Sequence, residues 1–98
     1  MEFDRFKQSL DRAEPPAGAS LALQALWQEA RGDWHAAHKL AQEQDDADGA
    51  WVHAYLHRVE GDERNAAGWY RRADKPYGKA PLAEEWEAIA KALCAKAG

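Results

Sequence analysis

The sequence predicts an all-α protein of about six helices, and three observations support this class. Apolar residues recur at helical spacing along most of the chain, with Trp51, Tyr55 and Val59 as the clearest set. Threonine is absent and the β-branched aliphatic residues are only Val52, Val59 and Ile89, whereas alanine is frequent, a composition that favours helix over strand. Glycine, aspartate and proline stand between the apolar segments, where helices end and begin.

The expected helices are bounded by residues that stop or cap a helix. Pro15 belongs to a segment that ends the first helix, because proline lacks the backbone N–H that a helix needs. Ser20 can cap the second helix, Gly32 ends it and Asp33 caps the third. Pro81 fits the first position of the last helix, where its missing N–H costs nothing. The expected helices span residues 3–13, 21–31, 34–44, 50–60 and 62–74, and a last one from Pro81 onward.

The stretch Trp51 to Ala73 predicts a helical hairpin around which the rest of the chain is arranged. Gly61 allows the left-handed conformation that ends the first helix of the hairpin, and Asp62 can cap the second. Each of the two helices carries one apolar stripe, so the hairpin should fold these stripes together. The expected core consists of Trp51, Tyr55, Ala66, Trp69 and Tyr70, with Leu26, Trp27, Leu40 and Trp86 closing its sides.

An internal repeat supports a stacked arrangement. The Gly61-Asp62 turn has a counterpart at Gly32-Asp33, 29 positions earlier, and alanines follow both turns at matching offsets. Two copies of a helix–Gly-Asp–helix unit predict antiparallel hairpins that each bury one face on the next. No linker is long enough to separate domains, so residues 1–98 should form one domain.

The second copy carries a resemblance to known helical repeats. The pattern Gly61-Asp62-x-x-x-Ala66-x-x-x-Tyr70-x-x-Ala73 resembles the second half of a tetratricopeptide repeat, and its last eight residues also resemble the Sel1-like repeat. This resemblance implies stacked helical hairpins that bind other proteins or peptides in a groove.

The first copy departs from the repeat pattern. Ala41 and Gln44 stand where other apolar residues are usual, and the 29-residue period is shorter than the family's period of about 34 residues. The two copies together cover roughly residues 20–75. The segment from Trp51 to Asp62 also resembles small bacterial proteins, a resemblance that implies no activity.

Composition excludes several classes of function. A net charge of −4 gives no general attraction to nucleic acid or to an anionic membrane. Cys94 is the single cysteine, so no disulfide can form within the chain and a reducing compartment is favoured. The charged N-terminal stretch has no apolar region of a signal peptide, and no apolar run is long enough to cross a membrane. These features predict a soluble cytoplasmic protein.

The histidines offer a candidate metal site. His53 and His57 lie one turn apart on one expected helix, and His35 and His38 share the preceding helix. If the two helices pack together, His35, His38, His53 and His57 could hold a tetrahedral zinc ion. The alternative is that these histidines are surface or half-buried side chains beside tryptophans. No HExxH motif and no cysteine pair accompany them, so we expect no metal and no cofactor.

No catalytic constellation is recognisable, because the chain lacks a phosphate loop, a dinucleotide fingerprint and a nucleophile elbow. We therefore expect a non-catalytic interaction module rather than an enzyme. Ten aromatic residues are difficult to bury in 98 residues, so an exposed aromatic patch should bind a protein or peptide, or a second copy of the chain. The expected surface is a hairpin groove bordered by His53, His57 and Arg58, with His38 nearby. The alternative function is binding of a small ligand or metal by the histidines, which their convergence in a cleft would favour.

Overall fold

A computed structural model describes residues 1–97, and no strand occurs within this range. The helices are α1 (Phe3–Gln8), the short 3-10 helix η1 (Ser9–Asp11), α2 (Leu21–Ala30), α3 (Trp34–Glu43), α4 (Ala47–Glu60), α5 (Glu63–Arg72) and α6 (Leu82–Ala97). The predicted all-α class with six helices is confirmed. The ends of α2 to α5 and the start of α6 lie within three residues of the expected positions.

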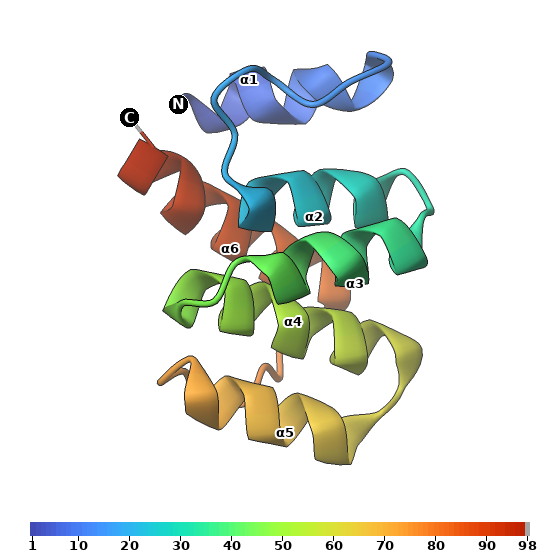
Figure 1. Cartoon of the computed structure of the whole chain (residues 1–98), viewed down its shortest axis with the longest axis vertical. Helices are drawn as coiled ribbons and strands as arrows, with labels where there is room; N and C mark the ends of the chain where they lie inside the picture. Colours follow the sequence, from blue (N-terminus) through green and yellow to red (C-terminus); the bar gives the residue numbers. More distant parts are fainter. Residues whose placement is uncertain (98) are drawn as a thin grey trace.

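Helices α1 to α5 follow one another along the long axis of the molecule, and α6 runs back behind them (Figure 1). Each of α2, α3 and α4 packs on the next helix in the chain, while α6 contacts α1, α2 and α4. The return of α6 brings the N-terminus close to the last helix, where the amino group of Met1 donates to the carbonyl oxygen of Cys94 at 3.1 Å. None of the described helices is both long enough and apolar enough to cross a bilayer.

The two Gly-Asp turns use the same hydrogen bonds, as their shared sequence predicts. Gly32 and Gly61 have φ angles of 89° and 87°, in the left-handed region where a side chain would be strained. The following N–H of Asp33 reaches the carbonyl of Gln28 at 2.9 Å, and that of Asp62 reaches the carbonyl of His57 at 2.9 Å. The Asp33 and Asp62 side chains then cap α3 and α5.

The expected first helix is too long. Residues 3–8 are α-helical, but the chain tightens into η1 and becomes extended at Arg12, so Ala13 is exposed rather than on an apolar stripe. Ser9 accounts for this change, because its hydroxyl donates to the carbonyl of Phe6 at 2.5 Å and its own carbonyl accepts from the Trp27 indole at 3.2 Å.

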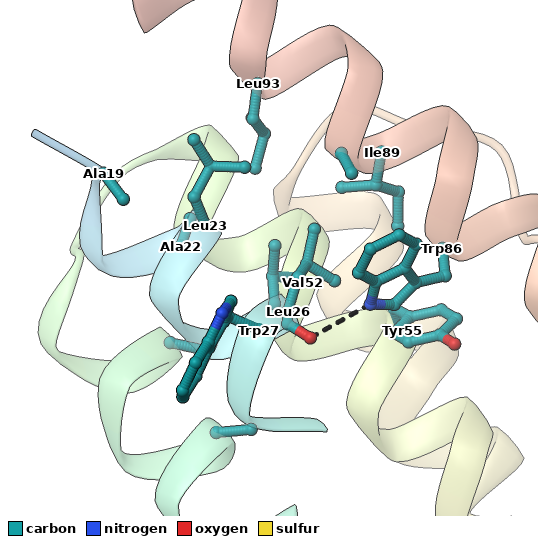
Figure 2. Close-up of a cluster of buried hydrophobic side chains, with 14 of the residues drawn as sticks. Ala19, Ala22, Leu23, Leu26, Trp27, Val52, Tyr55, Trp86, Ile89 and Leu93 are labelled. Atoms are coloured by element: carbon teal, nitrogen blue, oxygen red, sulfur yellow. Dashed lines mark hydrogen bonds between the residues drawn. The ribbon is translucent and has the colours of Figure 1, made fainter. Parts of the chain in front are cut away.

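The main core lies between α2, α4 and α6 (Figure 2). It extends to Phe6 of α1 and to Ala37 and Ala41 of α3. Trp86 crosses this core from α6, and its indole N–H donates to the carbonyl oxygen of Leu26 at 3.0 Å. Ile89 and Leu93 continue the same face of α6 against α2 and α4. The fully buried large side chains are Phe6, Leu23, Leu26, Trp27, Val52, Leu56, Tyr70, Ile89 and Cys94.

The expected single aromatic core is wrong, because its members divide between two clusters. Tyr55 belongs to the main core with Leu26, Trp27 and Trp86, whereas Ala66 and Tyr70 form a second cluster with Ala54. Trp51, Trp69 and Leu40 are only half-buried. The physical reason is that α4 contacts α2, α3, α5 and α6, so it buries several faces and not one stripe.

The exposed aromatic patch expected from the composition is also wrong. None of the ten aromatic side chains is exposed, and all lie within the described residues. Cationic side chains cover several of the half-buried rings. These contacts place Lys75 over Trp51 at 4.3 Å, Arg72 over Trp69 at 5.1 Å and Lys91 over Phe3 at 5.3 Å.

Candidate functional site

Three of the four histidines converge where α3 packs on α4. The imidazole rings of His53 and His57, one turn apart on α4, stack with their centroids 4.8 Å apart. His38 from α3 meets the ring of His53 edge-on at 4.6 Å and that of His57 at 5.3 Å. Each of these three residues, hereafter the histidine cluster, offers one ring nitrogen, and these nitrogens lie within 4.8 Å of one another.

Two tryptophans pack against the histidine cluster. Trp34 stacks on His38 with the ring centroids 4.9 Å apart, and its indole N–H donates to the carbonyl of Leu56 at 2.8 Å. Trp69 comes from α5 and stacks on His53 at 3.8 Å. Helices α3, α4 and α5 therefore all contribute an aromatic ring to this part of the molecule.

Burial keeps the central histidine neutral at neutral pH. The exposed fraction of His53 is 2%, and its Nδ1 atom has no hydrogen-bond partner among the described residues. Desolvation, together with the nearby His38, His57 and Arg72, lowers the pKa of His53 to about 4. Desolvation, with a contribution from His57, also lowers the pKa of His38. Both rings therefore have an unprotonated nitrogen at neutral pH.

A carboxylate fixes the orientation of the third ring. The Nδ1 atom of His57 lies 2.7 Å from Oε1 of Glu60, one turn further along α4. Because a carboxylate accepts hydrogen bonds, it favours the proton on Nδ1 and leaves Nε2 as the unprotonated nitrogen of the neutral ring.

The fourth histidine and Arg58 lie outside the cluster. His35 is exposed and meets the edge of the Trp34 ring, with the centroids 5.5 Å apart. Arg58 faces α6, where its Nη1 atom lies 2.6 Å from Oε1 of Glu85. Since His53 and His57 are buried and Arg58 is paired, these three residues do not border one open groove.

Sequence reasoning missed the network that holds Arg58. Glu85 is buried on α6, and its second carboxylate oxygen accepts a 2.5 Å hydrogen bond from the Tyr70 hydroxyl. Arg58 also donates to the carbonyl of Ala80, and a side chain at Gly78 would collide with the Glu85 carboxylate. The network therefore ties α4, α5 and α6 together. Its only signal in the sequence is a glutamate next to the apolar stripe of the last helix.

An apolar groove of about 500 Å³ lies where α1, α2, α4 and α6 meet. Leu82 lines this groove and, with an exposed fraction of 39%, is the only exposed large hydrophobic residue among those described. Carboxylates dominate its charged lining, and burial raises the pKa of one of them, Glu29. The apolar lining comprises Phe3, Leu10, Ala30, Tyr55, Val59, Leu82, Ala83 and Trp86, and the charged lining comprises Lys7, Glu29, Glu84 and Glu87. We call this surface the Leu82 groove.

Comparison with protein-family models, with curated proteins and with solved structures finds no match to this chain. The resemblance to tetratricopeptide and Sel1-like repeats therefore stays a prediction.

Proposed function

We propose that this protein is a non-catalytic helical module that binds a basic, amphipathic segment of another protein in the Leu82 groove. The observation that carries the proposal is the groove itself, whose apolar lining includes Leu82, the one large hydrophobic side chain that is exposed within residues 1–97. An apolar groove between packed helices is a common docking site for an amphipathic helix or peptide. A second copy of the chain is the competing occupant, and the test below includes it.

The charges of the groove favour a basic partner. The charged lining holds three glutamates, Glu29, Glu84 and Glu87, and one lysine, Lys7. Lys91 reaches Glu87 at 3.8 Å, and the groove still carries a net negative charge. The net charge of −4 adds a long-range attraction for cations and repels a second copy of the chain. A partner with apolar side chains on one face and lysine or arginine beside them would therefore match both features.

We further propose that the module is related to tetratricopeptide-like repeats and that it works in a reducing compartment. The shared geometry of the Gly32-Asp33 and Gly61-Asp62 turns supports a relation to tetratricopeptide-like repeats. Cys94 is a free and buried thiol, which supports a reducing compartment such as the bacterial cytoplasm.

A matched pair of variants on α6 tests the proposal. Leu82→Asp places a charge in the groove, whereas Ala88→Asp places the same charge at an exposed position outside its lining. The probe is a synthetic amphipathic peptide with leucines on one face and lysines on the other, measured by fluorescence anisotropy. We expect Leu82→Asp to weaken binding at least about tenfold, or 1.4 kcal/mol, and Ala88→Asp to bind like the parent protein.

Two further measurements sharpen the result. A peptide with glutamates in place of the lysines should bind much more weakly, and the protein alone should sediment as a monomer. Equal binding by the two variants, or equal binding of the two peptides, would contradict the proposal. A dimer that dissociates in Leu82→Asp but not in Ala88→Asp would identify a second copy as the occupant instead.

A further inference from the structure

The histidine cluster takes no part in the Leu82 groove, and its geometry points to a separate site. We propose that His38, His53 and His57 together bind one divalent transition-metal ion between α3 and α4, with zinc as the representative ion. Three features support this site: the separation of the ring nitrogens, a buried nitrogen without a hydrogen-bond partner among the described residues, and a carboxylate that orients one ring.

The separation of the nitrogens fits a small ion after a limited movement of side chains. The three nitrogens lie within 4.8 Å of one another, whereas ligands about 2.0 Å from a tetrahedral zinc ion lie about 3.3 Å apart. The widest separation therefore has to close by at most about 1.5 Å. His38 is half-buried and therefore less confined than His53 and His57, so its side chain is the one best able to rotate towards the other two.

The unpaired nitrogen is a second and independent observation. His53 is nearly fully buried on α4, yet its Nδ1 atom finds no hydrogen-bond partner in the part of the chain that the structure describes. A buried polar atom without a partner is unfavourable, and a metal ion bound at that atom is one way to satisfy it. If Nδ1 coordinates the ion, this cost disappears on binding.

In metal sites, the histidine nitrogen that does not bind the ion usually donates a hydrogen bond to a carboxylate or carbonyl, and Glu60 provides such a carboxylate for His57. The carboxylate lies 2.7 Å from Nδ1, which leaves Nε2 of the ring free to coordinate. Such a carboxylate fixes the ring orientation and increases the basicity of the ligand nitrogen. The same arrangement is therefore expected when the site holds a metal.

The donor set selects the class of ion. Three neutral imidazole nitrogens suit zinc, copper, nickel or cobalt, whereas magnesium and calcium prefer oxygen ligands. His35 is exposed and outside the cluster, so the fourth position falls to solvent. Because His38 belongs to α3 and the other two ligands to α4, a bound ion would also link the two Gly-Asp hairpins.

The competing explanation for the histidine cluster is a purely structural role. The three rings pack against Trp34 and Trp69, and such stacking by itself stabilises the α3–α4–α5 packing. The two explanations differ in one measurable respect, because only a metal site makes zinc affinity depend on His38 while sparing His35 on the same helix.

The test is isothermal titration of zinc into the chelator-treated full chain at neutral pH, with His38→Gln and His35→Gln as a matched pair. We expect a dissociation constant of about 10 μM or tighter for the parent protein and one site per chain. His38→Gln should weaken binding at least about tenfold, while His35→Gln should change it less than about twofold. Glu60→Gln should weaken binding about tenfold through the orientation of His57.

Circular dichroism establishes that each variant is folded before the titration. Zinc should raise the melting temperature of the parent protein, because the ion binds the folded chain. Magnesium at the same concentration should not. No zinc binding by the folded parent protein up to about 100 μM, or an equal loss in the two glutamine variants, would overturn the proposal. Leu82 lies outside the histidine cluster, so Leu82→Asp should bind zinc as tightly as the parent protein. The zinc titration therefore tests the metal site independently of peptide binding in the Leu82 groove.

Discussion

Single residues hold this fold together where its polar groups are buried, and Glu85 is the main example. Its carboxylate pairs with the Arg58 guanidinium and accepts from the Tyr70 hydroxyl, with exposed side-chain fractions of 9% for Glu85 and 17% for Arg58. A buried charge pair adds little to stability compared with an apolar substitute, but removal of one partner leaves the other unsatisfied. Arg58 thus serves the fold, and its replacement would confound any test of binding.

Glu85→Gln should therefore destabilise the protein. The amide cannot neutralise Arg58, so we expect the free energy of unfolding to fall by about 3 kcal/mol. The neighbouring Glu84→Gln is the control, because Glu84 is exposed and its change should stay within about 0.5 kcal/mol. Urea denaturation followed by circular dichroism measures both values. Similar small effects for the two variants would show that the network contributes little.

Acid should weaken the metal-free protein through His53. Its pKa is about 4 in the folded chain, against about 6.5 in an unfolded one. Folding favours the neutral ring, so this stabilising contribution is complete above pH 6.5 and is lost as the pH falls from 6.5 towards 4. The charged and titratable groups that face the ring, His38 on α3, His57 on α4 and Arg72 on α5, all disfavour its protonation.

Between pH 7 and pH 5, we expect the unfolding free energy to drop by about 2 kcal/mol on account of His53. Urea denaturation in the presence of a chelator at both pH values measures the change. In His53→Phe, which keeps a ring against Trp69, most of this pH dependence should disappear. A parent protein that is equally stable at the two pH values would refute the assignment.

At the scale of helices and turns, close backbone packing limits which positions accept a side chain. Gly49 lies in the first turns of α4, where an added Cβ atom would overlap the carbonyl oxygen of Gln44 at the end of α3. Gly68 lies within α5, and the nearest atom to its added Cβ is the Nη2 atom of Arg71 at 3.9 Å. Position 49 therefore has no room for a side chain, whereas position 68 has room for one.

Alanine substitutions at these glycines should have opposite effects. Gly68→Ala should stabilise the protein by about 0.5–1 kcal/mol, because alanine favours helix more than glycine does. Gly49→Ala should destabilise it by about 2 kcal/mol or more, since α3 and α4 must move apart to admit the methyl group. Thermal unfolding monitored by circular dichroism compares the two. A gain in stability for Gly49→Ala would show that the connection between α3 and α4 is looser than described.

Across the whole molecule, the sequence could predict the local features that depend on neighbouring residues. The Gly-Asp turns follow from the conformational freedom of Gly32 and Gly61 and from the capping ability of the aspartates, so both appear as expected. The spacing of His53 and His57 likewise fixed their common face on α4.

The features that depend on how helices pack could not be predicted in the same way. A pattern with one apolar stripe assumes one buried face, but α4 has neighbours on several sides and buries Val52 and Leu56 as well as Tyr55. Whether His35 or His38 reaches α4 depends on the rotation of α3 about its axis, which periodicity does not determine. The Glu85 network and the Leu82 groove require the position of α6, which no local pattern contains.

The central claim is that the Leu82 groove is the surface that binds a partner, and the indole N–H signals of the five tryptophans test it most directly. Trp86 lines the groove, whereas Trp34 and Trp69 lie at the histidine cluster. When the lysine-faced peptide is titrated into ¹⁵N-labelled protein, we expect the Trp86 signal to shift while those of Trp34 and Trp69 stay in place. An unmoved Trp86 signal at saturating peptide, or shifts confined to Trp34 and Trp69, would contradict the claim.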